Sequence, residues 1–364
     1  MTNITDPQDV LQDVLITKSG KPKVQPWRHK KTKTMYLAQS LHRIADSADT
    51  YKEFQKTHKK ANRIWHCGSR LEFTVENGVK RLKTASFCRG RMCAMCDWRR
   101  SMKTFWEVSK VMDEVQKQHP NLKPIFLTMT VKNCTGEELS ATLDEMFGGF
   151  HTFTTHRKSK RLIQGWFRAL EVTCNPDEYV TEKGYKKRKK FYDRNGIGVG
   201  DPNPVYETYH PHMHLVILVD KSYFSKGNKD YMTAEDWSRL WKISLKLDYD
   251  PVCDIRKTQK TGEGKVKVAE VAKYTLKDTE FIVKGEPDKT DKMVKDLSVA
   301  LKGRRLTAYG GIMKKIHKEL NLADNDENLV NITDEITVRD DLSSMVEIYD
   351  WSFGMLDYFR RADM

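Results

Sequence analysis

Three histidines alternate along one short stretch of the chain. His210, His212 and His214 are separated by single residues, and the apolar run Leu215–Val219 follows them. In an extended strand, residues i and i+2 lie on one face about 6.5–7 Å apart, so His212 and His214 point the same way. His210 joins them if the strand begins before Pro211. Two neutral imidazoles at this spacing can chelate one divalent metal ion. The alternative is a core strand with polar ends, but three alternating histidines in a chain with only 11 favour the metal site.

Four cysteines form a second candidate site. Cys88, Cys93 and Cys96 follow the pattern Cys-x-x-x-x-Cys-x-x-Cys, and Cys67 precedes them. Four thiolates would complete a tetrahedral structural zinc site, with His66 as a substitute ligand. The alternatives are plain buried thiols or a redox pair, although no thioredoxin-like pattern surrounds the Cys-x-x-Cys. The remaining cysteines read as ordinary small apolar residues: Cys134, Cys174 and Cys253.

The charge balance of the chain favours an acidic partner. The 364 residues include 64 lysines and arginines against 50 aspartates and glutamates, a formal net charge of +14. Nucleic acid is the partner that this charge suits best, although a ribosomal or membrane-surface protein would share it. No apolar stretch approaches the roughly 20 residues of a membrane span, and Met1–Gly20 lacks a signal-peptide core. We therefore expect a cytoplasmic protein without a membrane partner, whose odd number of cysteines argues against a disulfide framework.

A tyrosine on an expected helix, Val266–Phe281, could supply a nucleophile. Glu270 and Tyr274 lie four positions apart and Tyr274 and Lys277 three apart, so they share a helix face. A tyrosine hydroxyl has a pKa of about 10 and is a weak nucleophile until a neighbouring metal polarises the scissile phosphate. Attack on DNA would give a 5′-phosphotyrosine and a free 3′-hydroxyl, with Lys277 adding positive charge and Glu270 acting as general base for water. Taken alone, a tyrosine on an amphipathic helix is an ordinary core or surface residue.

The elements expected to position these residues alternate between strands and helices. Strands are expected at Ile125–Val131, Gly165–Cys174, Tyr209–Val219 and Val252–Arg256, and helices at Met35–Asp46, Ser101–Gln118, Glu137–His156, Ala234–Leu247 and Val266–Phe281. This order predicts an α+β fold: a small, mainly antiparallel sheet with helices on one face, plus an N-terminal cysteine-rich zinc module.

The expected division of the chain has five parts. They are a basic N-terminal arm and helix (1–59), a zinc-binding module with the following helix (60–120), a catalytic domain (121–285), a basic helical extension (286–322) and an acidic C-terminal tail (323–364). The tail carries 11 acidic and three basic residues, a net of −8, which leaves +22 for the rest. It could mimic nucleic acid, mediate subunit contacts or solubilise the protein. Its stretch Val346–Phe359 has enough aromatic residues to fold against another surface.

A hydrophilic insertion, 175–207, joins the second strand to the histidine strand and must begin and end near the proposed site. Its basic residues Lys187, Arg188, Lys189 and Lys190 alternate with aromatic residues over Thr181–Arg194. Charge that follows a phosphate backbone and rings that stack on bases suit single-stranded DNA. The alternative is a solvated, disordered loop.

The chain resembles rolling-circle plasmid replication initiators of the Gram-positive type 1 family, within the HUH endonuclease superfamily. The resemblance extends roughly from Trp27 to Lys315. Four motifs carry it in order: the Cys-Arg-x-Arg-x-Cys-x-x-Cys segment before Trp98-Arg99-Arg100, the strand Phe126-Leu127-Thr128-Met129-Thr130, the His-Pro-His-x-His strand and the Glu-x-x-Lys-Tyr-x-x-Lys helix. Cys93-Ala94-Met95-Cys96 lacks the proline that is usual in the family's knuckle.

The resemblance implies a ferredoxin/RRM-like HUH nuclease domain over residues 121–285. It implies that His212 and His214 bind Mg²⁺ or Mn²⁺, that Tyr274 is the nicking nucleophile, and that Glu270 activates water when replication terminates. A third, carboxylate ligand from a neighbouring strand is usual in the superfamily. Glu171 is the candidate for that ligand, and His210 is its rival.

The leading hypothesis is a plasmid replication initiator that binds double-stranded origin DNA and cleaves an unpaired strand. Lys273, next to the nucleophile, is expected to bind the DNA. The sequence has no Gly-x-x-x-x-Gly-Lys-Ser/Thr motif, so a host helicase, a polymerase and a single-strand binding protein are implied partners. The alternatives are a mobilisation relaxase or single-tyrosine transposase with the same chemistry, and a non-catalytic zinc-containing DNA-binding regulator. The sequence leaves the oligomeric state open, with a homodimer among the alternatives.

Overall fold

The structure, a computed structural model, describes residues 10–11, 14–16, 22–24, 26–76, 79–225, 227–257, 281–322, 329–330 and 345–361. The chain divides into two compact parts. Unit 1 consists of Met1–Trp106 with Asp324–Met364, and unit 2 consists of Glu107–Ala323. No helix in the described part of the chain is long and apolar enough to cross a membrane.

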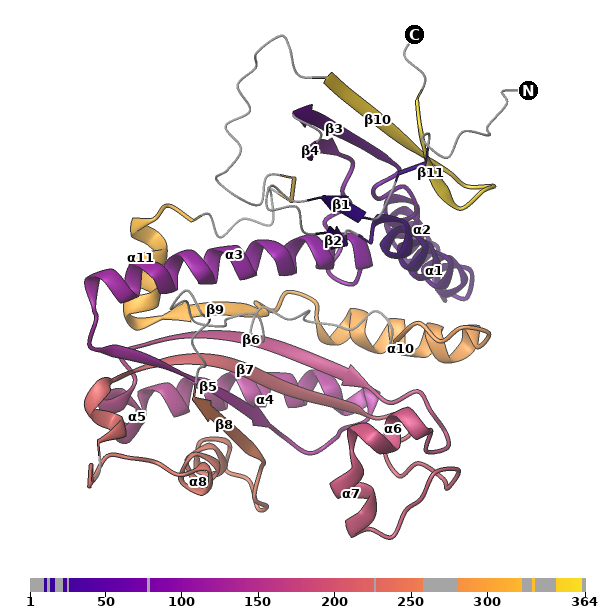
Figure 1. The fold of residues 1–364 in the computed structure, drawn as a ribbon. Helices are drawn as coiled ribbons and strands as arrows, with labels where there is room; N and C mark the ends of the chain where they lie inside the picture. The colour runs from indigo at the N-terminus through magenta and orange to yellow at the C-terminus, as the bar shows by residue number, and fades with distance from the viewer. Residues whose placement is uncertain are drawn as a thin grey trace. The chain divides into compact units, whose positions relative to one another are not determined.

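A five-stranded sheet forms the middle of unit 2 (Figure 1). Its strands lie in the order β8-β5-β7-β6-β9, and every neighbouring pair is antiparallel. The strands are β5 (Leu122–Thr130), β6 (Gly165–Cys174), β7 (Tyr209–Asp220), β8 (Cys253–Lys257) and β9 (Thr307–Gly310). The apolar run of β7 suits its central position, because a strand with both faces covered reads as a nearly continuous hydrophobic stretch.

Helices α4 (Gly136–Thr155) and α8 (Ala234–Leu245) cover one face of this sheet. Each begins with a capping box that satisfies some of its first free backbone N–H groups. The ring of Phe150 on α4 packs edge-on against Trp166 on β6, with the centroids 4.9 Å apart. On α8 the buried indole of Trp241 donates a hydrogen bond of 2.9 Å to a backbone carbonyl of β5. These contacts fix both helices on the sheet.

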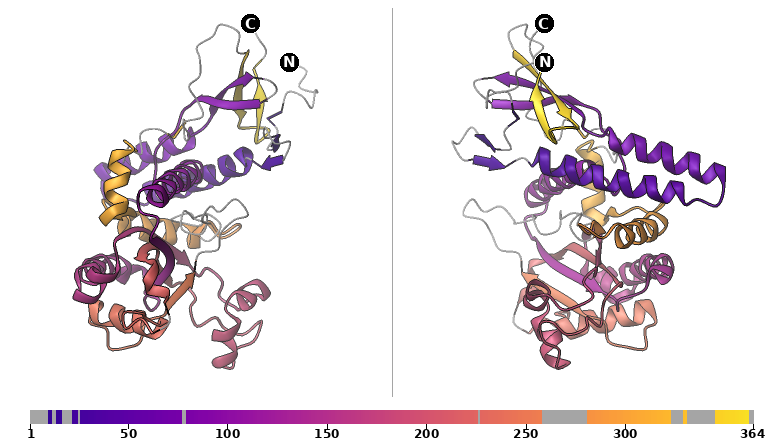
Figure 2. Two further views of the ribbon diagram at one scale, coloured as in Figure 1. Left: turned by 60° about the vertical axis from the view of Figure 1, so that its left-hand side comes forward. Right: turned by 90° about the vertical axis from the view of Figure 1, so that its right-hand side faces the viewer.

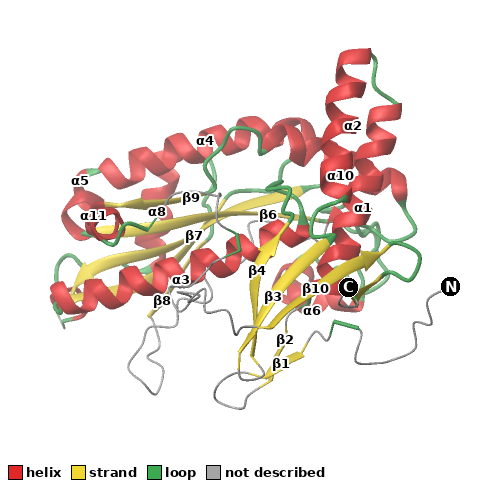
Figure 3. Cartoon of the chain, turned by 90° about the horizontal axis from the view of Figure 1, so that it is seen from above, coloured by secondary structure: helices red, strands yellow, loops and turns green. Residues whose placement is uncertain are grey.

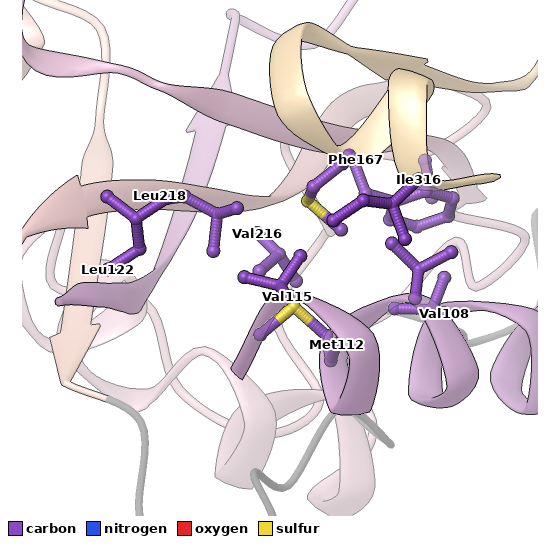
Figure 4. Packing of buried hydrophobic residues seen from close by; sticks show 11 residues of the cluster. Val108, Met112, Val115, Leu122, Phe167, Val216, Leu218 and Ile316 are labelled. Carbon is purple, nitrogen blue, oxygen red and sulfur yellow. The ribbon is translucent and has the colours of Figure 1, made fainter. Parts of the chain in front are cut away.

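The other face of the sheet carries a cluster of buried apolar residues (Figure 4). Helix α3 (Ala94–Gln118) and helix α11 (Gly311–Glu319) pack there against β6 and β7. The cluster includes Val108, Met112, Val115, Phe167, Val216, Leu218, Met313 and Ile316. Alternate residues of β7 share a face, so His212 and His214 follow Val216 and Leu218 on this same side. The histidines thus lie at the end of this face where the chain enters β7.

The insertion between β6 and β7 contains two short helices, α6 (Glu182–Lys187) and α7 (Lys189–Arg194). Tyr192 is buried, and its ring stacks on Tyr185 with the centroids 5.8 Å apart. Backbone hydrogen bonds join Asn175 to Glu207 and Thr208 at the base of the insertion, and others join Val180 to Gly200 and Asp201 within it. The described insertion is therefore folded, rather than the solvated loop of the alternative. The remaining elements of unit 2 are α5 (Arg157–Leu162), η2 (Lys221–Phe224) and α10 (Pro287–Ala300).

Unit 1 combines a helical hairpin with a four-stranded antiparallel sheet in the order β11-β10-β3-β4 (Figure 3). Its helices α1 and α2 lie side by side (Figure 2), and the first part of α3 belongs to the same unit. The bounds are α1 (Trp27–Asp46), α2 (Tyr51–Trp65), β3 (Arg70–Glu76), β4 (Val79–Ala85), β10 (Met345–Ser352) and β11 (Asp357–Arg360), with a small hairpin of β1 (Val14–Ile16) and β2 (Pro22–Val24).

The acidic C-terminal segment supplies half of this sheet. Strand β10 pairs with β3, and β11 pairs with β10. Tyr349, Trp351 and Tyr358 are buried, and the Tyr358 hydroxyl donates a hydrogen bond of 2.6 Å to the carbonyl of Gly68. Residues 345–361 are therefore an integral part of unit 1, whereas the sequence placed them in a separate tail.

The predicted α+β class with antiparallel sheets is confirmed, but helices pack on both faces of the sheet in unit 2, whereas the sequence predicted them on one face. Strand β6 has the bounds expected from sequence, and α4 and α8 begin within one residue of the expected starts. The sequence patterns predicted neither α2 nor the pairing of β3 with β4 and β10. The expected helix Val266–Phe281 lies outside the described residues, apart from its last residue.

Trp351→Ala tests whether the C-terminal strands stabilise unit 1. The Trp351 side chain is only 5% exposed, so truncation should lower the free energy of unfolding by about 3–5 kcal/mol. Thermal and urea unfolding followed by circular dichroism measure this change. Met355→Ala in the same hairpin, at a side chain 61% exposed, should change it by less than about 0.5 kcal/mol. Equal, small effects of both substitutions would mean that β10 contributes little to stability.

Candidate functional site

Glu171, His212 and His214 meet on the face of the sheet between β6 and β7. In the register of the two strands Glu171 lies directly opposite His212, and Ala169 lies opposite His214. The Oε2 atom of Glu171 lies 3.2 Å from Nε2 of His212 and 2.9 Å from Nε2 of His214. The Glu171 side chain is 3% exposed. The strand pairing alone therefore brings a buried carboxylate between two imidazoles.

The other ring nitrogens of the two histidines are held by hydrogen bonds. Nδ1 of His212 lies 3.1 Å from the backbone carbonyl of His210, and Nδ1 of His214 lies 3.2 Å from Oγ1 of Thr128 on β5. A carbonyl oxygen only accepts, so Nδ1 of His212 carries the proton in this hydrogen bond. In the neutral ring, Nε2 then presents a lone pair towards the Glu171 carboxylate. A cation between them would remove the repulsion of the two lone pairs.

The donor set fits a divalent metal ion. The three ligand atoms of Glu171, His212 and His214 lie within 4.8 Å of one another. Neighbouring ligands of an octahedral ion with bonds of about 2.1 Å lie about 3.0 Å apart, close to the two measured N···O distances. The carboxylate suits Mg²⁺ and Mn²⁺, and the imidazoles suit transition-metal ions such as Fe²⁺, Ni²⁺ and Zn²⁺. These residues could therefore hold the ion that the sequence predicts.

His210 lies beside this group. Its ring stacks on that of His212, with the centroids 5.2 Å apart. Burial, and then the charges of His212 and Arg188, lower the pKa of His210 to about 4. His210 is not among the three residues whose ligand atoms converge. Of the two rivals for the third ligand, Glu171 is the one that the structure places against both histidines.

Four cysteines converge in unit 1. The Sγ atom of Cys67 lies 3.5 Å from those of Cys93 and Cys96, and the Sγ atoms of Cys88 and Cys96 are 3.7 Å apart. In a tetrahedral site with Zn–S bonds of about 2.3 Å, the sulfur atoms lie about 3.8 Å apart. The backbone N–H of Gly90 donates to the Cys88 thiol. The arrangement could hold a structural zinc ion.

The surroundings of one cysteine, Cys93, favour negative charge on its sulfur, whereas the hydrogen bond to Cys88 raises the pKa of the Cys67 thiol well above its usual value. Burial acts to raise the pKa of the Cys93 thiol, but hydrogen bonds from the other three thiols and from Thr34 bring it well below its usual value. Lys31 is fully buried beside the cluster, and its Nζ atom donates to the carbonyls of Trp65 and Cys67. Burial lowers the pKa of Lys31 to about 8, while the charges of the cysteines oppose this shift. The lysine thus places positive charge next to the thiolates.

The basic residues of the insertion lie on α6, on α7 and between them. Lys187, Lys189 and Lys190 are exposed, and Arg188 is half-buried. The charge of Arg188 acts on His210, so this part of the insertion lies near the histidines. Four further predicted residues lie outside the described part of the chain: Glu270, Lys273, Tyr274 and Lys277. Sequence reasoning missed Thr128, although threonines at 128 and 130 alternate on a strand as the histidines do.

Fold and site together define an α+β protein with a His-His-Glu group on an antiparallel sheet and a separate group of four cysteines. The family model described as Replication protein matches residues 79–359. A protein named "Protein rep" from Streptococcus pneumoniae serotype 2 (strain D39 / NCTC 7466) is 34% identical over 351 residues, which cover 95% of each chain. The chain belongs to this family of plasmid replication proteins, as its motifs predict.

Other relatives carry the same name. "Protein rep" from Bacillus amyloliquefaciens is 34% identical over 348 residues, covering 88% of this chain and 90% of the relative. "Protein rep" from Lentilactobacillus hilgardii is 30% identical over 356 residues, covering 96% of this chain and 98% of the relative. No solved structure matches the chain significantly.

Thr128→Val should weaken Mn²⁺ binding about 10–100-fold, because the valine cannot hold the His214 ring through Nδ1. Isothermal titration calorimetry of the metal measures the change. Thr130→Val is the matched control, since the Thr130 hydroxyl donates to the carbonyl of Val252 instead of a histidine. Equal affinities for the wild type and both variants would contradict the role given to Thr128.

Cys93→Ala should remove the bound zinc, because three thiolates cannot complete the tetrahedral site. Elemental analysis of the purified protein should then give about one zinc ion per chain for the wild type and none for the variant. Cys253→Ala removes a buried thiol away from the cluster and should retain the metal. A metal-free wild type would refute the zinc assignment.

Proposed function

We propose that this plasmid replication protein initiates rolling-circle replication as a metal-dependent single-strand DNA endonuclease and strand transferase. It would bind the double-strand origin, nick one strand through a tyrosine, leave a 3′-hydroxyl primer, and rejoin or release the strand at termination. The observation that carries the proposal is the buried Glu171 carboxylate between the Nε2 atoms of His212 and His214. Such a group can hold the divalent ion that cleavage of a phosphodiester bond uses.

In this proposal the sheet holds the metal and a later segment supplies the nucleophile. Glu171, His212 and His214 hold Mg²⁺ or Mn²⁺, which when bound would polarise the scissile phosphate and stabilise charge on its oxygens. The Tyr274 oxygen forms a bond to phosphorus, and the bond from phosphorus to the 3′ oxygen breaks. That oxygen keeps the electron pair and takes up a proton. One phosphodiester replaces another, so a later attack by a 3′-hydroxyl can rejoin the strand.

Residues near the nucleophile divide the remaining work. Glu270 takes a proton from water when the strand is released by hydrolysis at termination. Lys277 places positive charge beside the phosphate, and Lys273 contacts the DNA next to Tyr274. The cysteine cluster holds zinc for structure alone.

The insertion would hold the single strand near the cleavage site. Lys187, Lys189 and Lys190 supply exposed charge, and Arg188 lies near His210. The Phe191 ring, 41% exposed, is available for stacking on a base. Since the sequence contains no nucleotide-binding loop, a host helicase would unwind the duplex, and a host polymerase and single-strand binding protein would complete replication.

A search for a covalent adduct tests this function. The protein is incubated with supercoiled DNA of its own replicon, with Mn²⁺ or with EDTA, and the products are separated under denaturing conditions. We expect a metal-dependent adduct at the 5′ end of the nicked strand. Tyr274→Phe should abolish adduct and nick but retain binding, because only the reacting hydroxyl is lost. Tyr231→Phe, at an exposed tyrosine, should leave adduct formation and nicking unchanged.

Other outcomes would redirect the assignment. Binding without any adduct at a verified origin would favour the zinc-containing DNA-binding regulator. Adduct formation at a transfer origin or a transposon end would favour the relaxase or the transposase. Glu270→Ala should spare the first nick and impair release by hydrolysis; loss of the first cleavage would overturn the role given to Glu270.

A further inference from the structure

Four basic residues form a stripe along one face of α2. Lys52, Lys56, Lys59 and Arg63 follow the spacing i, i+4, i+7 and i+11, which places them on the same side of a helix. All four are exposed. With a rise of about 1.5 Å per residue, the stripe is about 16 Å long. We call these four residues the α2 stripe.

The opposite side of α2 explains why the stripe faces outward. Ala61 and Ile64 are the buried residues of the helix. Phe54 and His58 stack on each other, and His58 also contacts His42 of α1 edge-on. The apolar and aromatic residues thus face α1 and the interior of unit 1, and the basic residues remain on the far side.

No acidic residue in the described part of the chain forms an ion pair with the stripe. Glu53, one turn from Lys56, is engaged with the N-cap residue Thr50. Burial, followed by the charges of Arg63 and Lys56, lowers the pKa of the neighbouring Lys60. The positive charges on α2 are thus crowded together, which is unfavourable unless an anion lies against them.

We propose that the α2 stripe binds the phosphate backbone of double-stranded DNA and anchors unit 1 on the replicon. This inference rests on the proposed function, since it supplies the duplex contact that a DNA-nicking initiator needs. Duplex DNA carries one negative charge per about 1.7 Å of its axis, so a stripe of this length meets several phosphates. Lysine and arginine contacts to phosphate position a protein on the duplex.

The composition of the stripe distinguishes duplex from single-stranded DNA. Surfaces for single strands combine charge with aromatic rings on which bases stack. On α2, Phe54 is half-buried, and the exposed Tyr51 stacks on it at the start of the helix, so no aromatic ring lies between the residues of the stripe. On the insertion, by contrast, the exposed Phe191 directly follows Lys189 and Lys190. The two basic surfaces therefore suit different forms of DNA.

The cysteine cluster fixes the end of the helix that carries the stripe. α2 ends at Trp65, and Cys67 follows two residues later. The buried ammonium of Lys31 on α1 donates to the carbonyls of both residues. The helix is thereby held at its C-terminal end to α1 and to the four sulfur atoms, so the stripe is presented on a fixed support.

Two double variants test the proposal: Lys52→Gln/Lys56→Gln and Lys59→Gln/Arg63→Gln. Dissociation constants are measured by fluorescence anisotropy over a salt series, on a duplex from the replicon and on an unrelated duplex of equal length. Each variant should bind both duplexes roughly tenfold more weakly near physiological salt, and the slope of log K against log[salt] should fall by about 1.8. Metal-dependent nicking of a single-stranded oligonucleotide should remain as in the wild type.

Matched controls separate the stripe from net charge. Lys314→Gln/Lys318→Gln removes two exposed charges at the same helical spacing from α11 and should leave the duplex affinity and slope nearly unchanged. Lys52→Arg/Lys56→Arg keeps the charge and should bind duplex as the wild type does. Circular dichroism melting and zinc content establish that each variant is folded.

The outcomes distinguish the two proposals. Wild-type affinity and salt slope in both glutamine variants would overturn the stripe as a duplex-binding surface, as would an equal loss in the α11 control. A wild type that binds duplex through the stripe but never nicks DNA would leave the stripe standing and overturn the endonuclease.

Discussion

The register between β6 and β7 is the constraint on which the candidate site depends. It sets Glu171 opposite His212 and buries the carboxylate between two imidazoles. A buried carboxylate is costly unless a cation or hydrogen-bond donors neutralise it. A slip of one residue would turn Glu171 to the opposite face, where α4 and α8 pack. The same register sets Phe167 opposite Val216, and both side chains belong to the core cluster, so a slip would also remove Phe167 from that cluster. The packing of the core and the geometry of the site therefore depend on the same register between β6 and β7.

The cysteine cluster has a comparable place in unit 1. Cys67 follows α2, Cys88 and Cys93 lie between β4 and α3, and Cys96 lies in the first turn of α3. Lys31 of α1 reaches the carbonyl of Cys67, and the hydroxyl of Tyr358 reaches the carbonyl of Gly68 beside it. Elements from the two ends of the sequence thus meet at one short turn. A metal ion bound by the four sulfur atoms would hold the helical hairpin and the sheet together.

Local patterns allowed much of the site to be predicted, and contacts between distant residues explain what was missed. Alternating histidines predicted β7, and the apolar stretch around Glu171 predicted β6. Helix α2 was not predicted because only two of its residues, Ala61 and Ile64, are buried, although its basic residues recur at helical spacing and make it amphipathic. Strand β10 pairs with β3, about 275 residues earlier in the chain, as Met345 opposite Val75 illustrates, and no local pattern reports such pairing. The nucleophile helix remains a prediction, since it lies outside the described residues.

The acidic C-terminal segment determines where the positive charge of unit 1 remains. In the described residues of this segment, the carboxylates form ion pairs within the unit. Ion pairs join Glu347 to Lys80, Asp350 to Arg70 and Arg361, and Asp357 to Arg28. These pairs neutralise basic residues of the sheet and of the start of α1, but none involves the α2 stripe. Ion pairs neutralise several basic residues of the sheet, whereas the four residues of the α2 stripe form none in the described part of the chain, so the stripe is a directed basic surface of unit 1. A directed surface can orient a duplex as well as attract it.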